Sequence, residues 1–366
     1  MGTVSEVCAS SERLALLLTG GGARCRRLLA AAPGGDGRPL ARLASAGASP
    51  ALLTAVRQAL AERVPTVLER VIAAGWRWLT PEDPEYPALL GEVSDPPLGL
   101  FVRGELAPAP RVAVVGSRRP TAYGRQVATM LGEELARAGV VVLSGMARGV
   151  DGAAHRGALE VAGGSTWAVW GTGPDRVYPP EHGSLAEEIS ERGALLTEYP
   201  PGTPPRRHHF PERNRILAGL ADAVVVVEAA SRSGALVTAR LAVDEGRDVF
   251  AVPGSIFSEL SVGPNTLLRL GARPLLVPAD VLDLLDVDAK VAVGPAAGMA
   301  STLERHLAAG ESLTADELAA RAGVGVGEVL ARLLELEVAG VVARSPDGRY
   351  ARCRAAVPGR AGGEPE

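Results

Sequence analysis

The chain contains 366 residues, of which 47% are hydrophobic and 22% charged, a composition typical of a soluble globular protein with two or three domains. No apolar run approaches the roughly 18 residues of a transmembrane helix, and the N-terminus lacks the regions of a signal peptide, so we expect a cytoplasmic protein without membrane contact. The net charge of −4 excludes a generally basic surface, and any anion-binding site therefore has to be local.

Helices are predicted for the N-terminal part of the chain. Ser49 is suited to cap a helix that ends near Ala61, with Pro50 at the first helical position, where a missing N–H costs nothing. A second helix is expected to begin around Pro65 and to end at Gly75.

Short apolar runs then alternate with helical segments over residues 111–254. Because these runs are hydrophobic throughout and are separated by helices, they predict a buried parallel sheet of about six or seven strands. The expected strands are 112–115, 140–143, 167–170, 194–197, 223–227 and 249–252. The expected helices are 122–138, 152–162, 184–191, 211–220 and 234–245.

The C-terminal part has the pattern of a winged helix. Thr314 to Glu317 is a capping box that opens a short helix, a second helix is expected over 326–339, and two strands should flank a hairpin at 346–348. The apolar side of the second helix is expected to consist of Val329, Leu330, Leu333, Leu334 and Val338. Residues 301–354 hold seven arginines and eight acidic residues, so we predict that this module contacts another protein, or the rest of its own dimer, instead of reading duplex DNA.

The predicted fold class is α/β: an extended Rossmann-like parallel sheet with an N-terminal helical domain and a C-terminal winged-helix domain. The expected segments are a SAM-like helical domain at 1–80, a Rossmann-like domain at 84–286, a linker at 287–299, a winged helix at 300–355 and a disordered tail at 356–366. In the first segment, the turn at 20–24 fits either a helix-hairpin-helix or an ordinary helical cap.

The predicted strands end in loops of glycine, serine and arginine. Gly116-Ser117-Arg118 follows the first strand, Gly145 to Gly149 the second, and Ser231 to Gly234 the strand at 223–227. Loops at the carboxyl ends of parallel strands share one crevice, where glycine admits a phosphate and arginine binds it. Alternatively, each glycine only makes a tight turn. Neither GxGxxG nor GxxxxGK[ST] occurs, so a dinucleotide site and a P-loop have little support.

Asp151 and His155 lie four residues apart and share a helix face. One interpretation is an acid–base pair. We favour the other, in which Asp151 caps the helix and His155 packs beneath it, because no nucleophile or metal-ligand cluster accompanies them. Cys8, Cys25 and Cys353 are scattered, which fits a reducing compartment and argues against zinc or a disulfide framework.

The most basic segment is 206–215, where four arginines and one glutamate give a charge of +3 around Phe210. Arginines that follow phosphates, together with an aromatic ring on which a base stacks, form the simplest platform for single-stranded nucleic acid. The alternative is a solvated charge run with Phe210 in the core. The segment falls between two strands, where a crevice loop belongs, and this favours the binding interpretation.

These residues give the chain a strong resemblance to the DNA-processing protein A family (DprA, also called Smf). The matching motifs, within about 84–285, are VVGSR at 114–118, SGMARGVDGAAH at 144–155, GTG at 171–173 with YP at 178–179, EYPPG at 198–202, FPERNRI at 210–216, Ser231, Gly234-Ala235-Leu236, Thr238-Ala239 and VPG at 252–254. The resemblance implies a Rossmann-like dimer that binds single-stranded DNA, protects incoming DNA and helps to load the RecA recombinase during natural transformation. It also implies no catalysis and no cofactor.

By position in the motifs, Arg118, Arg207 and Phe210 fall where the family contacts DNA. The full set of DNA-binding candidates is Gly116, Ser117, Arg118, Gly145, Arg148, Gly149, Arg207, Phe210, Arg213, Asn214, Arg215, Ser231, Ser233, Gly234 and Thr238. The sequence departs from the family in two places: Pro264 stands where serine is more frequent, and the first 75 residues lack a clear helix-hairpin-helix motif.

Two other functions remain open. A nucleotide-sugar hydrolase of the lysine-decarboxylase-like Rossmann group would carry a PGGxGTxxE loop with a catalytic carboxylate, but the corresponding stretch at 231–238 has none. A transcription factor led by the winged helix would show sequence-specific duplex binding.

Overall fold

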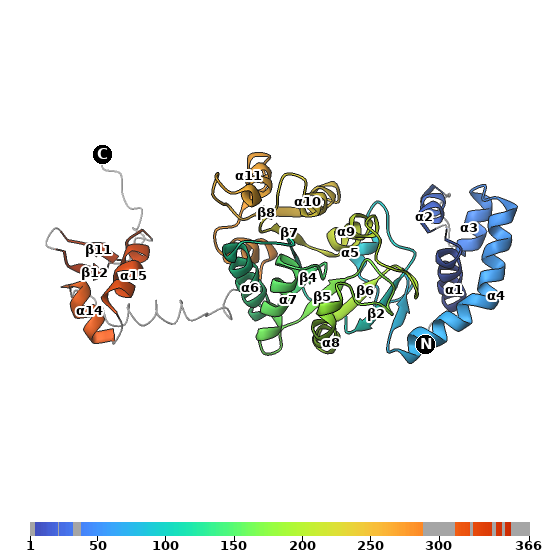
Figure 1. The fold of residues 1–366 in the computed structure, drawn as a ribbon, viewed down its shortest axis with the longest axis horizontal. Coiled ribbons are helices and arrows are strands. Elements are labelled where there is room, and N and C mark those ends of the chain that lie inside the picture. Colours follow the sequence, from blue (N-terminus) through green and yellow to red (C-terminus); the bar gives the residue numbers. More distant parts are fainter. Residues whose placement is uncertain are drawn as a thin grey trace, which may run out of the picture. The chain divides into compact units, whose positions relative to one another are not determined.

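A computed structural model describes residues 4–20, 22–31, 38–287, 312–322, 325–338, 342–345 and 348–352. These residues fall into two compact units, one within Met1–Val291 and one within Ala292–Glu366. The first contains the N-terminal helices and the large sheet, and the second the small C-terminal fold (Figure 1). The α/β fold class is confirmed. Most of the predicted linker and all of the predicted tail lie outside the described residues.

The large sheet has nine strands in the described chain, in the order β1-β2-β6-β5-β4-β3-β7-β8-β9. The strands from β6 to β9 are parallel, whereas β1 and β2 pair antiparallel. Their bounds are β1 Arg77–Leu79, β2 Leu100–Gly104, β3 Arg111–Val115, β4 Val141–Ser144, β5 Thr166–Val169, β6 Ala194–Thr197, β7 Ala223–Val226, β8 Asp248–Ala251 and β9 Arg273–Pro274. The prediction of six or seven strands was too low because β1 and β9 are only three and two residues long.

The five helices predicted between the strands are confirmed to within two residues at each end. Among the described helices, none has the length and apolarity required to cross a membrane. The helices of this unit are α1 Val4–Leu18, α2 Gly22–Ala31, α3 Pro39–Ser45, α4 Pro50–Ala73, α5 Ala88–Gly91, α6 Ala122–Arg137, α7 Val150–Glu160, α8 Gly183–Arg192, α9 His209–Leu220, α10 Gly234–Asp244, α11 Val262–Arg269 and α12 Ala279–Leu282.

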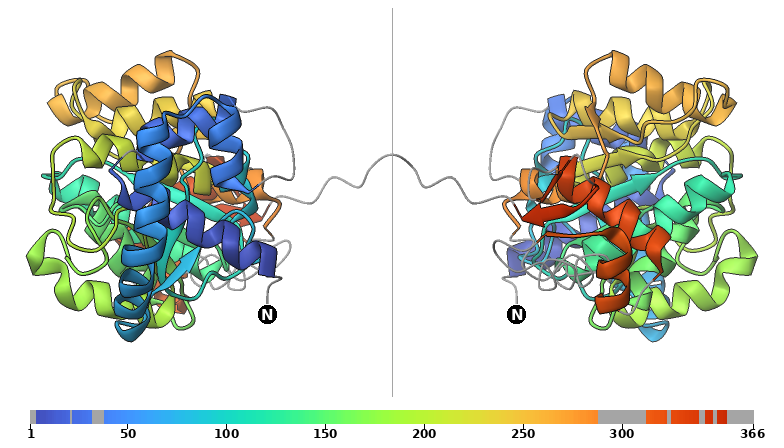
Figure 2. Two further views of the ribbon diagram at one scale, coloured as in Figure 1. Left: turned by 90° about the vertical axis from the view of Figure 1, so that its right-hand side faces the viewer. Right: turned by 90° about the vertical axis from the view of Figure 1, so that its left-hand side faces the viewer.

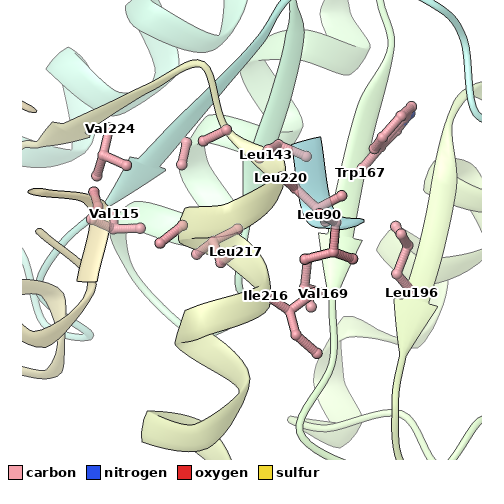
Figure 3. Packing of buried hydrophobic residues seen from close by; sticks show 14 of the residues in the cluster. Leu90, Val115, Leu143, Trp167, Val169, Leu196, Ile216, Leu217, Leu220 and Val224 are labelled. Carbon is pink, nitrogen blue, oxygen red and sulfur yellow. The ribbon is translucent and has the colours of Figure 1, made fainter. Parts of the chain in front are cut away.

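Helices cover both faces of the sheet. Successive strand residues point to opposite faces, so Ala113 and Val115 pack with α5, α9 and α10, while Val112 and Val114 pack with α6, α7 and α12. Helix α9 inserts Ile216, Leu217 and Leu220 among the strand side chains of the first face (Figure 3). The packing on both faces fixes the strand ends, and therefore the loops that follow them.

The N-terminal helices share a buried apolar cluster with one end of the sheet. Leu14, Leu43 and Val56 belong to the same cluster as Phe101 and Trp170. Figure 1 shows these helices, in blue, beside the end of the sheet that holds β2 and β6, and the left view of Figure 2 has them in front of the sheet. Their core is therefore continuous with that of the Rossmann-like part.

Helix α4 corrects the prediction of two separate helices. Ser49 caps it as predicted, since its hydroxyl accepts a hydrogen bond from the Leu52 amide at 3.3 Å. The helix nevertheless continues through Pro65 to Ala73. Burial of Val64 and Val71 on either side outweighs the backbone hydrogen bond that proline removes.

The C-terminal unit is a winged helix. Its elements are β10 Ser312–Leu313, α14 Ala315–Ala322, α15 Val326–Val338, β11 Val342–Arg344 and β12 Tyr350–Arg352, with the strands in the order β10-β12-β11. The capping box is confirmed: the Thr314 amide donates to Glu317 at 2.8 Å, and the Glu317 amide donates to the Thr314 hydroxyl at 3.2 Å.

One part of the winged-helix prediction was wrong. Val329 and Leu333 of α15 are buried as expected, but Leu330 and Leu334 are exposed and Leu336 is buried instead. The side chain of Val338 lies outside the described residues. Only one face of α15 packs against the rest of this small domain, and the leucines beside that face are exposed to solvent.

Candidate nucleic-acid interface

A cavity of about 350 Å³ opens at the carboxyl edge of the large sheet. In the sheet, β3 lies between β4, the next strand in the chain, and β7. The chain reaches β7 only after it has passed through β5 and β6 on the far side of β4. The strand order therefore reverses between β3 and β7, and the loops that follow these two strands diverge. Ligands of open α/β sheets usually bind in the crevice at such a point.

Ten of the fifteen predicted residues line this cavity: Gly116, Ser117, Arg118, Arg207, Phe210, Arg213, Asn214, Ser233, Gly234 and Thr238. They come from the loops after β3 and β7, from the segment that leads into α9, and from α9 and α10. The tertiary structure thus brings together candidates that lie more than 100 residues apart in the chain.

Arg118 and Phe210 contact each other at the rim. The Arg118 guanidinium carbon lies 5.2 Å from the centroid of the Phe210 ring. The Phe210 ring also contacts the ring of Tyr178, with the centroids 5.5 Å apart and the planes tilted by 39°. Phe210 is half-buried against Gly171, while Arg118 and Arg207 are exposed. The rim therefore offers two cations and a pair of aromatic rings to a ligand.

The floor of the cavity consists of buried charged groups. The Asp151 carboxylate accepts hydrogen bonds from the amides of Gly145 (3.1 Å) and Ala147 (3.2 Å). Arg213 donates to the carbonyl of Gly145 at 2.8 Å and to that of Val169. Burial lowers the pKa of Arg213 to about 10, so its guanidinium stays charged at neutral pH. Arg213 contributes positive charge to the cavity, while its Nη1 donates to backbone carbonyls and its Nε to the Asn214 side chain.

The loops after β3 and β4 are packed directly onto each other. Gly149 has a φ of +80°, and a side chain at this position would lie 2.3 Å from the Ser117 carbonyl. The Val150 amide donates to that same carbonyl at 3.1 Å. Gly149 is thus required for its conformation and for the close approach of the two loops, and it lies behind the cavity wall.

The opposite wall is the first turn of α10. Ser233 caps this helix by accepting from the Ala235 amide at 3.2 Å. Thr238 and Asn214 both donate to the Gly234 carbonyl, at 3.4 and 3.3 Å. These bonds hold the N-terminus of α10, with its positive dipole end, toward the cavity.

Four further predicted contacts do not line the cavity. Arg148 is exposed and forms an ion pair with Glu181, and Ser231 is exposed in the loop after β7. Arg215 turns to the other side of α9, where it pairs with Glu198 and Asp95. Gly145 lies beneath Arg213, and a side chain there would collide with its guanidinium.

The Glu198 carboxylate joins the sheet to the N-terminal helices. Glu198 is buried and pairs with both Arg215 and Arg26, the latter at 3.3 Å. Burial raises its pKa despite these two cations. Arg26 of α2 also pairs with Asp95 at 2.8 Å. Arg26, which follows the turn predicted at 20–24, therefore forms ion pairs with two carboxylates.

His155 packs beneath the loop after β4, as favoured. It is fully buried, and its Nδ1 lies 2.7 Å from the Thr166 hydroxyl. The capping assignment for Asp151 was wrong in position, because Gly149 is the N-cap and Asp151 bonds the preceding loop from within the first turn. Both residues support the loop.

Sequence reasoning gave no role to Tyr178, Glu181 or Leu260. Leu260 lines the cavity, and the other two lie next to predicted candidates. Tyr178 belongs to a motif that the sequence displays, but its contact with Phe210 depends on the fold.

Comparisons with known proteins identify the family of this chain. The family model described as DNA recombination-mediator protein A matches residues 77–286, and the DprA winged helix domain matches 300–348. Protein Smf of Escherichia coli (strain K12) is 43% identical over 293 residues, covering 76% of this chain and 78% of its own. DNA processing protein DprA of Bacillus subtilis is 39% identical over 226 residues, covering 61% and 76%.

Two solved structures are similar as well. DNA processing protein A from Streptococcus pneumoniae superimposes with a TM-score of 0.62 at 33% identity, covering 77% of this chain and 98% of its own. DNA processing protein A from Helicobacter pylori, studied for its single-stranded DNA binding mode, gives a TM-score of 0.52 at 31% identity, covering 57% and 95%.

Proposed function

The chain belongs to the DNA recombination-mediator protein A family of DNA-processing proteins, and we propose that it binds single-stranded DNA in the cavity at the carboxyl edge of its sheet. The observation that carries this proposal is the contact between Arg118 and Phe210 at the rim of that cavity. A cation beside a half-buried ring matches the alternation of phosphate and base in a single strand.

A gel-shift comparison of single- and double-stranded oligonucleotides of the same sequence tests the proposal. Single strands of any sequence should bind more tightly than duplexes, and binding should weaken steeply with salt. Preference for one duplex sequence would instead favour the transcription-factor alternative.

The finer role that we propose is recombination mediation: the protein protects incoming single strands and helps to load the RecA recombinase during natural transformation in the cytoplasm. The family membership and the relatives' DNA-processing names support this role. The test is the rate of RecA filament formation on single strands coated with single-strand-binding protein. An unchanged rate upon addition of the protein would contradict it.

We also propose that the protein acts as a homodimer through the late part of the large unit. Leu270, Leu276 and Val277 are more than half exposed, which is unusual for three apolar side chains so close in the chain. Leu270→Glu should then yield a monomer by light scattering, whereas Ile72→Glu on the exposed side of α4 should not. A wild-type monomer at micromolar concentration, with and without DNA, would exclude the dimer.

No catalytic step is proposed. The carboxylate nearest the cavity, Asp151, is held by two loop amides beside a buried arginine, which is a structural arrangement. The stretch 231–238 that would carry the hydrolase carboxylate instead forms the capped start of α10. Release of free base from nucleoside monophosphates would revive the hydrolase alternative.

A further inference from the structure

The loop after β8 exposes two large apolar side chains. Ile256 is 84% exposed and Phe257 93% exposed. Two of the other three phenylalanines, Phe101 and Phe250, are fully buried. Adjacent apolar side chains that face solvent in this way usually mark a contact with a partner.

Hydrogen bonds hold the loop in a defined conformation. Asn265 donates from Nδ2 to the Gly254 carbonyl at 2.9 Å and accepts from the Gly254 amide at 3.2 Å. The Phe257 amide donates to the Ser255 hydroxyl at 3.2 Å, and a further turn closes between Ser258 and Ser255 at 3.0 Å. Because the loop is already ordered, presenting the Phe257 ring to a ligand costs little additional conformational entropy.

The same loop borders the cavity. Leu260 is one of the cavity-lining residues, and its carbonyl accepts from the Ala229 amide after β7 at 2.7 Å. Strands β7 and β8 are parallel neighbours, so the loop leaves the sheet at the edge where the cavity opens. The exposed pair is therefore continuous with the candidate interface.

We infer that Phe257, supported by Ile256, is a second base-stacking contact, on the β8 side of the cavity, for the single strand that Phe210 binds on the other side. This inference rests on the proposed function. Phe210 packs on the loop after β5, and β8 lies four strands further along the sheet. Four strand spacings of about 4.8 Å amount to roughly 19 Å, a length that a polynucleotide spans and a mononucleotide does not.

The chemistry between the two rings favours a nucleic acid over a protein partner. The edge between them carries Arg118, the glycine and serine of the β3 loop, and the amides at the start of α10. Cations and the positive end of a helix dipole suit phosphates, and a ring at each end suits bases. An apolar protein surface would leave these donors without acceptors.

Binding of oligothymidylates of two lengths, followed by fluorescence anisotropy, tests the inference. For a strand of about 16 nucleotides, Phe257→Ala and Phe257→Leu should each weaken binding about fivefold or more, while Phe257→Trp retains it. A dinucleotide is too short to reach from one ring to the other across roughly 19 Å, so all variants should bind it as the wild type does. Ile72→Ala, at an apolar side chain that is 65% exposed on α4, is the matched control.

The other outcomes overturn the inference in distinguishable ways. If Phe257→Ala binds the long strand with full affinity while Arg118→Ala binds it more weakly, the single strand does not contact Phe257. The proposed function then still stands. If neither variant is weakened, the proposed function itself fails. Full affinity of Phe257→Leu would show that no aromatic stacking occurs, and a monomer of Phe257→Ala by light scattering would assign the loop to a protein contact.

Discussion

The guanidinium of Arg118 lies over the ring of Phe210, with 5.2 Å between the guanidinium carbon and the ring centroid. Arg118 comes from the loop after β3, and Phe210 from the first turn of α9. A phosphate contact and a stacking contact are thus adjacent on one surface, which allows their contributions to be separated by mutation.

Arg118→Ala should weaken the binding of all single-stranded sequences alike. The loss of one phosphate contact reduces the slope of log affinity against log salt by roughly 0.7 for single strands. Titrations at several salt concentrations measure this slope. Arg119→Ala is the matched control, because Arg119 is exposed next in the chain but does not line the cavity. If the Arg118→Ala variant is folded and has the wild-type salt slope, Arg118 makes no phosphate contact.

Phe210→Ala should cost about 1–3 kcal/mol of single-strand binding through the lost stacking. Because Phe210 is half-buried, its loss should destabilise the fold by less than the roughly 3–5 kcal/mol typical of a fully buried phenylalanine. Thermal melting and binding are measured on the same sample. A large loss of stability with full affinity would assign the ring to the core.

Glu181→Gln should strengthen single-strand binding and steepen its salt dependence. Arg148 pairs with Glu181 on the surface, close to the aromatic pair, and the hydrogen bond from Arg148 lowers the pKa of the Glu181 carboxyl. An exposed ion pair of this kind is weak, so removal of the carboxylate frees Arg148 for a phosphate. The gain should disappear in the Arg148→Ala background. A gain that persists there would show that Glu181 acts through general charge alone.

The fold should lose stability below pH 6.5 through His155. Burial lowers the pKa of His155 to about 3 in the folded state, against about 6.5 in the unfolded chain. Below pH 6.5 the unfolded state therefore binds a proton that the folded state does not, and this residue lowers the free energy of unfolding by up to about 1.4 kcal/mol per pH unit.

Urea unfolding at pH 6.5 and pH 5 measures this effect in the wild type and in His155→Gln. The variant should lose less stability between the two pH values, because the other titrating groups are common to both proteins. Equal losses would mean that His155 is not the responsible group.

Ending the chain at Gly298 should leave single-strand affinity within about threefold, which is under roughly 0.7 kcal/mol. Helix α15 exposes the apolar residues Val326, Leu330 and Leu334, a surface that suits protein and not phosphate. Arg349 of the wing pairs with Glu317 at 3.0 Å. A loss of tenfold or more, or sequence-specific duplex binding by the winged helix, would contradict the prediction.

The sequence by itself determined the features that depend on neighbouring residues. The strand ends, the capping box at Thr314, the Ser49 cap and the position of the Gly116 loop follow from local patterns of side-chain type. Because the carboxyl ends of parallel strands share one edge, these patterns also predicted that the loops after β3, β4 and β7 would meet.

Only the tertiary structure decided what each charged or apolar side chain contacts. Arg213 and Arg215 are two residues apart in the same basic run, yet one turns toward the backbone beneath the cavity and the other toward Glu198 and Asp95. Likewise Phe257 is exposed while Phe250 is buried. Their partners lie in distant parts of the chain, and the helix and strand geometry that selects among them exists only once those parts have packed together.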